Sequence, residues 1–268
     1  MILLDIKNMT IELETPEGLI RAVDRINLTI REGEIRGLVG ESGSGKSLIA
    51  KAIVGVLNKR WHITADRFSW AGQDLLRLSY EEQRKIIGRD IAMIYQEPSR
   101  SMDPTAPILE QLIESIPDSE LESSWWGRPF ERRKKAIALL HKVGIRDHQA
   151  IFNSYPYQLP EGVCQKIMIA MAIAKKPKLL IADEPTTALE STTQAQLFRL
   201  LASFNQLKGM SILLISHELE TVARNTQTLS VLYCGQLVEA GETATILKSP
   251  LHPYTDALIK SCLLYTSP

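Results

Sequence analysis

Long hydrophobic runs, net charge and cysteine are all scarce in this sequence of 268 residues. No stretch of about 18 apolar residues occurs, so the sequence predicts no membrane-spanning helix. Lys and Arg total 31 and Asp and Glu total 31, a balance that argues against binding nucleic acid by phosphate neutralisation. The three cysteines, Cys164, Cys234 and Cys262, are too few and too far apart for a disulfide framework or a zinc site. We therefore expect a reducing, cytoplasmic setting, with no secretory signal at the N-terminus.

Hydrophobic residues make up 44% of the chain, which is enough for a large buried core. Residues 3–7, 10–14 and 22–30 alternate apolar and polar side chains, and this period predicts β-strands. Further along, predicted strands alternate with predicted helices, which indicates a parallel sheet covered on both faces. We expect those strands at 34–39, 90–96, 179–183, 210–216 and 229–233, and the helices at 46–57, 163–175 and 191–207. The stretch 97–156 is rich in proline, with its best helix at 128–143, and it predicts a helical insertion.

The most specific motif lies between a predicted strand and a predicted helix. It consists of Gly40, Glu41, Ser42, Gly43, Ser44, Gly45, Lys46 and Ser47. The pattern and its context are those of a phosphate-binding loop. Glycines let successive backbone N–H groups turn toward phosphate oxygens, and the helix adds the positive end of its dipole. Lys46 can reach the β- and γ-phosphates, and the Ser47 hydroxyl can ligate Mg²⁺.

Two acids follow the apolar run at residues 179–183, which predicts a strand buried on both faces. In α/β proteins, ligands bind beyond the carboxyl ends of such strands. Asp183 is suited to hold the Mg²⁺ shell, through water, and Glu184 is suited to polarise an attacking water. An apolar strand that ends in acids is common by itself, so this interpretation depends on the phosphate-binding loop upstream.

With these motifs in order, the sequence resembles the ATP-binding subunits of ABC transporters over nearly its whole length. Gln96 matches the glutamine that contacts Mg²⁺ and water in that family, and His217 matches the switch histidine that contacts the γ-phosphate. Residues 187–190 stand where the family has its D-loop, with Glu190 in place of the usual aspartate. The resemblance implies catalytic roles for Glu184, His217 and Gln96, and Mg²⁺ contacts for Ser47, Gln96 and Asp183.

The resemblance also implies the architecture. We expect an α/β P-loop NTPase fold, with an N-terminal antiparallel β-subdomain, a parallel-sheet core and an inserted helical subdomain. The whole chain, 1–268, is expected to form one ATP-binding domain. Its core and β-subdomain fall at about 1–96 and 157–250, and the helical subdomain starts at about 97–156 and continues into the signature helix. A C-terminal helix is expected at 251–268, without the tail that relatives carry.

The motifs at residues 182–189 and 252–255 resemble the oligopeptide and dipeptide importer branch. Within that branch, the segment at residues 158–166 resembles the transporters of antimicrobial peptides. This resemblance implies an ATPase that uses ATP and Mg²⁺ to power peptide uptake. The implied partners are a second ATP-binding subunit, two transmembrane permease subunits and a periplasmic or extracellular substrate-binding protein, with no nucleic acid. The implied location is peripheral, on the cytoplasmic face of the inner membrane.

The signature segment departs most from the family. It comprises Leu159, Pro160, Glu161, Gly162 and Val163, of which only Leu159 and Gly162 match. Pro160 replaces a serine and has no N–H to donate. Glu161 replaces a glycine, and a carboxylate aimed at a phosphate adds like-charge repulsion. One interpretation is a weakened signature; the other is that Glu161 turns away and the N–H groups of Gly162 and Val163 still serve.

In that family two domains pair head to tail, and each ATP site joins one chain's phosphate-binding loop to the other chain's signature. An intact loop beside a degenerate signature therefore predicts an asymmetric heterodimer with one hydrolysing site and one slow site. The alternative is an ATP-binding regulatory subunit with little hydrolysis of its own. Intact Glu184 and His217 argue against that alternative.

Two aromatic patterns remain. No Phe, Tyr or Trp occurs between Ile11 and Ile30, where the family places a ring against adenine, so Ile20 or Arg21 is expected to pack on the base and GTP to be tolerated. Trp125 and Trp126 are expected to pack inside the helical subdomain rather than to touch a membrane subunit.

The basic run at 132–135 is expected to be a solvated helix face, with a membrane-surface role as the weaker alternative.

Overall fold

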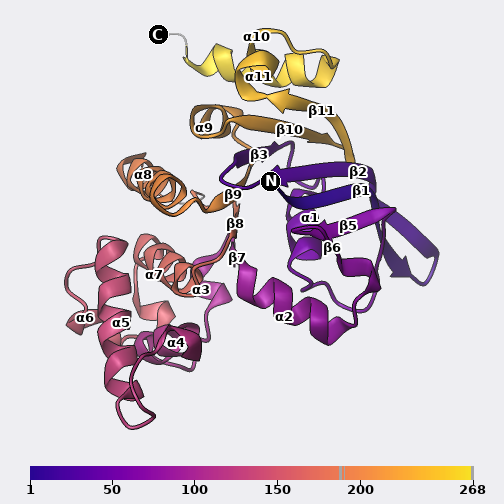
Figure 1. Cartoon of the computed structure of the whole chain (residues 1–268). Helices are drawn as coiled ribbons and strands as arrows, with labels where there is room; N and C mark the ends of the chain where they lie inside the picture. The colour runs from indigo at the N-terminus through magenta and orange to yellow at the C-terminus, as the bar shows by residue number, and fades with distance from the viewer. Residues whose placement is uncertain (187–188, 190, 267–268) are drawn as a thin grey trace.

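The strands of the chain form two sheets with helices packed around them (Figure 1). This computed structural model describes residues 1–186, 189 and 191–266, without the side chains of Lys208 and residues 262–266. One sheet is antiparallel and the other is mainly parallel. The predicted α/β fold class is therefore confirmed.

The antiparallel sheet is built around a long N-terminal hairpin. Its strands are β1 (Ile2–Thr15), β2 (Gly18–Arg31), β4 (Trp61–Thr64), β5 (Arg67–Trp70) and β6 (Gln73–Asp74). The expected strands at 3–7, 10–14 and 22–30 are parts of β1 and β2, which pair from Ile2–Arg31 to Thr15–Gly18. The apolar face of this hairpin shares a buried core with α1, so the sheet is anchored beside the phosphate-binding loop.

The larger sheet brings four candidate segments to one edge. Its strands are β3 (Ile35–Val39), β7 (Ile91–Ile94), β8 (Leu179–Asp183), β9 (Ser211–Ser216), β10 (Thr228–Tyr233) and β11 (Gln236–Glu242). Their order is β11-β10-β3-β9-β8-β7, and only β11 pairs antiparallel. The segments that follow β3, β9, β8 and β7 therefore emerge side by side, and these segments hold the predicted site residues.

Helices cover both faces of this sheet and also form a separate group. The α-helices are α1 (Lys46–Ile53), α2 (Tyr80–Asp90), α3 (Pro98–Ser101), α4 (Ile108–Ser115), α5 (Arg128–Lys142), α6 (Gln149–Phe152), α7 (Glu161–Ala174), α8 (Ser191–Lys208), α9 (Leu219–Asn225), α10 (Thr243–Lys248) and α11 (Pro253–Thr266). Helices α4 to α7 gather at the lower left of Figure 1, apart from the hairpin. Across the described residues, none of the helices combines the length and apolar character that crossing a membrane requires.

Two local expectations are wrong. The helix predicted to reach Leu57 ends at Ile53, because Gly55 adopts a φ of 69° and closes the helix. The N–H of Gly55 bonds to the Ala52 carbonyl at 3.2 Å and that of Val56 to the Lys51 carbonyl at 3.1 Å, which is a Schellman motif.

The tryptophan pair does not pack inside the helical group. Trp125 and Trp126 are 64% and 76% exposed, and their rings stack on each other with centroids 3.6 Å apart. They lie in the loop before α5, whose buried side carries Ala136, Leu139 and Leu140 instead. The large apolar area of the two indole rings predicted burial, but the loop that carries them lies at the surface of the protein.

Candidate nucleotide-binding site

The loop between β3 and α1 has a shape that only glycine permits at two positions. A Cβ on Gly40 would lie 2.1 Å from the Leu232 carbonyl oxygen, and Gly45 has a φ of 108° at the start of α1. Glycine reaches such backbone angles without steric cost. The loop therefore curls tightly over the amino end of α1, where backbone N–H groups are available to an anion.

The Lys46 ammonium lies within this loop. Its Nζ donates to the carbonyl oxygens of Gly40 at 2.9 Å and Glu41 at 2.8 Å. Burial lowers the pKa of Lys46, whereas the charges of Glu184 and Asp183 oppose that shift. A cation held at the loop by its own backbone is placed to exchange those carbonyl contacts for phosphate oxygens.

Asp183 and Ser47 form a polar pair beside the loop. The Ser47 hydroxyl donates to Asp183 Oδ1 at 2.9 Å, and Asp183 is only 3% exposed. Burial raises the pKa of Asp183, while the hydrogen bond from Ser47 lowers it. Hard oxygen atoms such as these are the donors that Mg²⁺ prefers.

Glu184 lies between the two other predicted catalytic residues. Gln96 Nε2 donates to Glu184 Oε2 at 3.2 Å, and His217 Nδ1 lies 3.1 Å from the same oxygen. The Glu184 side chain is 11% exposed, whereas that of His217 is 50% exposed. Glu184 has a φ of 47°, and its N–H donates to the Ile215 carbonyl at 2.9 Å. A left-handed non-glycine residue at a candidate site fits a backbone constrained for function.

The structure brings together the loop and the residues after β7, β8 and β9, but it leaves the signature segment on the helical side. That segment starts α7 and has no hydrogen bond to the loop within the described ranges. The predicted D-loop residues Thr187, Ala188 and Glu190 lie outside the described residues. Leu189 is described, and its N–H donates to the Thr186 carbonyl at 3.1 Å.

In the signature segment, Glu161 faces its own subunit. The Ser99 N–H, in α3, donates to Glu161 Oε1 at 3.4 Å. The Val163 N–H is bonded to the Pro160 carbonyl at 2.9 Å, so it is already engaged. In the part of the chain that the structure describes, the N–H groups of Glu161 and Gly162 have no hydrogen-bond partner, as is usual for the first turn of a helix.

The two candidates for base stacking differ in their surroundings. Arg21 is paired with Glu12 at 3.0 Å and with Asp24 at 3.1 Å. Ile20 is 55% exposed on β2. Of the two, Ile20 has the accessible apolar surface that packing on a base requires.

One contact to the loop could not be predicted from the sequence. The Tyr254 hydroxyl, in α11, accepts a hydrogen bond from the Glu41 N–H at 3.1 Å. The Tyr254 ring packs against Tyr233, with centroids 4.3 Å apart. The segment at 252–255 attracted attention only through its family resemblance, because nothing in its residue types indicates a contact 213 residues away.

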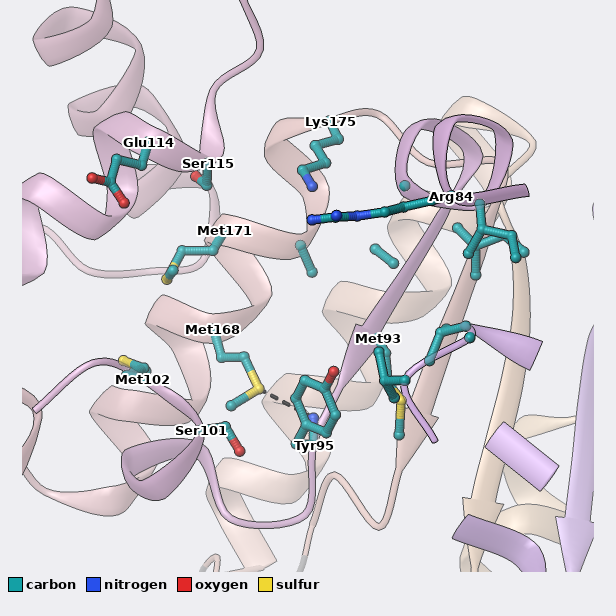
Figure 2. Close-up of a pocket in the computed structure, with 18 of the residues that line it drawn as sticks. Arg84, Met93, Tyr95, Ser101, Met102, Glu114, Ser115, Met168, Met171 and Lys175 are labelled. Carbon is teal, nitrogen blue, oxygen red and sulfur yellow. Dashed lines mark hydrogen bonds between the residues drawn. The ribbon is translucent and has the colours of Figure 1, made fainter. Parts of the chain in front are cut away.

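A groove of about 880 Å³ separates α2 from the helical group. Its lining includes Arg84, Tyr95, Met168, Met171 and Lys175 (Figure 2). The Tyr95 N–H donates to the Met168 sulfur at 3.2 Å, so β7 and α7 meet at its floor. Methionine side chains adapt to varied partner surfaces, so this lining favours a protein contact.

The loop and its neighbours fit a nucleotide with Mg²⁺. The Ser44 hydroxyl is buried without a hydrogen-bond partner in the described structure, inside a loop that also holds the Lys46 cation. Ser47, Asp183 and Gln96 supply oxygen atoms of the type that Mg²⁺ prefers. These residues provide a positive, N–H-rich cradle with hard donors along one side, which suits a triphosphate.

Fold and site thus define a P-loop nucleotide-binding protein, and comparisons with known proteins make this more specific. Residues 23–187 match the ABC transporter family, and residues 238–266 match the C-terminal region of oligopeptide and dipeptide transporters. The peptide transport system ATP-binding protein SapD of Salmonella typhimurium is 53% identical over 261 residues, 97% of this chain and 79% of the relative. The dipeptide transport ATP-binding protein DppD of Escherichia coli K12 is 42% identical over 97% of this chain and 78% of the relative.

A solved structure agrees with these sequence matches. The dimeric ATP-binding cassette MJ0796, in a post-hydrolysis state bound to ADP and Pi, superposes with a TM-score of 0.77 and 26% identity. The match covers 90% of this chain and 99% of that one. The chain therefore belongs to the ABC transporter family, as an ATP-binding subunit with the ATPase fold of that family.

Proposed function

We propose that this chain hydrolyses ATP to power a peptide transporter, from the cytoplasmic face of the membrane. The observation that carries the proposal is the position of Glu184 between Gln96 and His217, beside the Ser47–Asp183 pair. The names of the relatives, which are peptide and dipeptide transport proteins, support peptides as the cargo. Uptake of antimicrobial peptides is the finer form of this proposal.

The chemistry follows from the placement of charge. The loop N–H groups and Lys46 hold the phosphates and stabilise the charge that develops as the terminal bond breaks. Glu184 polarises the attacking water, and Gln96 and His217 fix the direction of its carboxylate. Ser47, Asp183 and Gln96 would hold Mg²⁺, which when bound neutralises charge on the phosphates.

Glu184→Gln tests the hydrolytic role against the regulatory alternative. Loss of a general base typically lowers turnover by about 10²–10⁴-fold, so we expect phosphate release to fall by that range. ATP binding, measured by equilibrium dialysis, should stay within about twofold of the wild type because the loop is intact. An unchanged, low phosphate release in both proteins would instead favour a subunit that binds ATP and regulates.

We propose further that the chain works in an asymmetric pair with a different ATP-binding subunit. Pro160 cannot donate an N–H, and the Val163 N–H is bonded to the Pro160 carbonyl, so within the described residues the signature segment keeps the N–H groups of Glu161 and Gly162 as donors for a partner's nucleotide but lacks the donor of the family's serine. Because the Glu161 carboxylate turns toward the Ser99 N–H of its own chain, we propose that the signature is weakened by the missing donor at Pro160 rather than by repulsion between Glu161 and a phosphate. The site with this chain's loop would hydrolyse ATP, and the site with its signature would be slow.

Activity of the purified chain, alone and with its partner subunit, tests the asymmetry. We expect the pair to hydrolyse ATP at least about tenfold faster than the chain alone, since a homodimer has the poor signature at both sites. Restoring the family residues with Pro160→Ser and Glu161→Gly should raise activity of the chain alone. Equal rates for the wild-type chain and the pair would contradict the asymmetric proposal.

The groove between α2 and α7 supports the proposed permease partners. Its Met168, Met171 and Tyr95 side chains offer an apolar floor (Figure 2). The charged side chains of its lining are Arg84, Lys175, Asp103 and Glu114. We propose that a short cytoplasmic segment of a permease subunit docks there, within a complex of two permeases and an external substrate-binding protein. Met171→Glu should reduce co-purification with the permeases, whereas Leu207→Glu, at an exposed site on α8, should not.

A further inference from the structure

Three large aromatic side chains lie exposed within six residues at the start of α5. Trp125, Trp126 and Phe130 are 64%, 76% and 77% exposed, and we call them the aromatic tip. The two indole rings stack on each other rather than on the body of the protein. Exposed apolar clusters of this kind mark interaction surfaces, because each ring leaves a large area in contact with water.

The loop that carries the tryptophans is held in place from behind. Glu131 accepts hydrogen bonds from the N–H groups of Glu122, at 3.0 Å, and Ser123, at 2.9 Å. Arg132 donates to the Ile113 and Ile116 carbonyls, each at 2.7 Å, and pairs with Asp118. The aromatic tip is therefore presented on a clamped loop, which lowers the entropy cost of binding.

The charge beside the tip is weakly positive. Arg133 and Lys134 are exposed and have no ion-pair partner among the described residues, and Arg133 lies over the Phe152 ring at 5.0 Å. The neighbouring acids Asp118 and Glu131 are neutralised by Arg132 and Lys135. Glu122 is the exposed acid of this stretch that lacks a described ion pair. Two cations against one carboxylate favour an anionic partner modestly.

The shape of the tip favours a lipid surface over a protein. The three rings lie outside the three grooves that α2, α5, α7 and α8 line, so the tip is a protruding surface rather than part of those grooves. The loop between α4 and α5 instead projects beyond the helices at the bottom left of Figure 1. Indole rings and cationic side chains on a convex surface match the chemistry of a membrane interface, where Trp prefers the headgroup level.

We propose that the aromatic tip inserts into the headgroup region of an anionic bilayer, with Arg133 and Lys134 against the lipid phosphates. The contact adds a direct membrane anchor to the one that permease subunits provide. It rests on the proposed location at the membrane, but it needs neither ATP hydrolysis nor a permease, so purified chain and protein-free vesicles suffice to test it.

The test is sedimentation with vesicles of phosphatidylcholine and phosphatidylglycerol (3:1), together with quenching of tryptophan fluorescence by brominated lipid. We expect wild-type protein to co-sediment and to be quenched. The double variant Trp125→Ala and Trp126→Ala should lose at least about tenfold in vesicle partitioning, because two large apolar groups no longer insert. Leu207→Ala with Leu251→Ala, at sites that are 83% and 87% exposed, is the matched control and should bind like the wild type.

Further variants test whether positive charge contributes to vesicle binding and whether that binding is independent of ATP hydrolysis. Lys134→Glu should weaken binding to anionic vesicles severalfold, whereas Lys85→Glu, on α2, should not. Lys46→Ala should bind vesicles like the wild type even if ATPase activity is absent, so failure of the proposed function would be seen separately. Vesicle binding that the double tryptophan variant retains would overturn the proposal. The proposal would also be overturned if the wild-type protein did not bind vesicles and the double tryptophan variant lost co-purification with the permeases. The aromatic tip would then be a protein contact.

Discussion

The hydroxyl oxygen of Tyr254 accepts a hydrogen bond from the backbone N–H of Glu41 at 3.1 Å, across 213 residues of sequence. Tyr254 lies near the start of α11, in the middle of the matched C-terminal region at residues 238–266, and Glu41 is the second residue of the phosphate-binding loop. Packing on Tyr233 fixes the ring of Tyr254 in place. The C-terminal region therefore helps to shape the nucleotide site.

Tyr254→Phe removes the oxygen that accepts from Glu41 and keeps the ring packing. A single neutral hydrogen bond contributes about 0.5–1.5 kcal/mol, so we expect the Kd for ATP to rise roughly threefold to tenfold. Tyr157→Phe is the matched control, because Tyr157 is 68% exposed and far along the chain from the loop. Isothermal titration with a slowly hydrolysed ATP analogue measures the difference; equal Kd values for both variants would assign Tyr254 a packing role only.

Gly40→Ala is expected to abolish ATP binding. The new Cβ would lie 2.1 Å from the Leu232 carbonyl oxygen, so either β10 or the loop has to move. Gly43→Ala is a graded comparison, since Gly43 has open space around its Cβ position but a φ of 80°. We expect Gly43→Ala to weaken ATP binding by a smaller factor than Gly40→Ala. A Gly40→Ala protein with wild-type ATP affinity would show that the loop shape is not rigid.

Glu131 makes the loop before α5 sensitive to acid. Hydrogen bonds from the Glu122 and Ser123 N–H groups lower the pKa of Glu131 to about 2. Because this folded pKa lies below the ordinary value of 4.5, the stabilising contribution is fully present above about pH 4.5 and is lost as pH falls toward 2. Glu131→Gln should mimic that loss at pH 7.

Hydrogen exchange measures the effect of Glu131→Gln directly. We expect the protection of the Glu122 and Ser123 amides to fall by about tenfold, because a neutral acceptor bonds more weakly than a carboxylate. Glu122→Gln is the control, since the Glu122 side chain does not clamp the loop. Protection that is unchanged in Glu131→Gln at pH 7 would contradict the clamp.

Base selectivity is a further prediction. Because Arg21 is paired with Glu12 and Asp24, we expect Ile20 to pack on the base, with little discrimination between adenine and guanine. GTP should compete with ATP, and its inhibition constant should lie within about tenfold of the Kd for ATP. A tenfold ratio corresponds to a difference of about 1.4 kcal/mol in binding free energy. Ile20→Tyr should raise affinity for ATP through stacking, and Leu19→Tyr should not. A preference for ATP above a hundredfold in the wild type would contradict this prediction.

The strand β8 shows how much of the fold is encoded locally. Its unbroken apolar run predicts a strand at residues 179–183, and the structure has β8 at those residues, fully buried. The phosphate-binding loop was also predicted from local residues through its glycine spacing, although the closeness of the Leu232 carbonyl to Gly40 depends on a distant strand. The strands β4, β5 and β6 were not predicted, since two to four residues give no measurable period. The helix α2 was missed although its capping box, Ser79 with Glu82, is readable in the sequence.

The relations that the sequence could not predict all depend on packing between distant segments. The direction of Glu161 is set by α3 lying against α7, where Ser99 presents its N–H. The contact of Tyr254 with the loop depends on where α11 docks. The exposure of Trp125 and Trp126 depends on a loop whose position their hydrophobicity does not determine. Residue type predicted which side chains come together at the candidate site, but not the orientation of Glu161, Tyr254 or the two tryptophans.

A crystal structure of the Glu184→Gln protein with ATP and Mg²⁺ tests the central claim most directly. The account predicts that the β- and γ-phosphates lie in the loop at residues 40–47. Lys46 should have left the Gly40 and Glu41 carbonyls for phosphate oxygens, and residue 184 should face a water beside the terminal phosphate. A nucleotide bound elsewhere, or phosphates in the loop with Lys46 still on its own backbone carbonyls, would contradict the account.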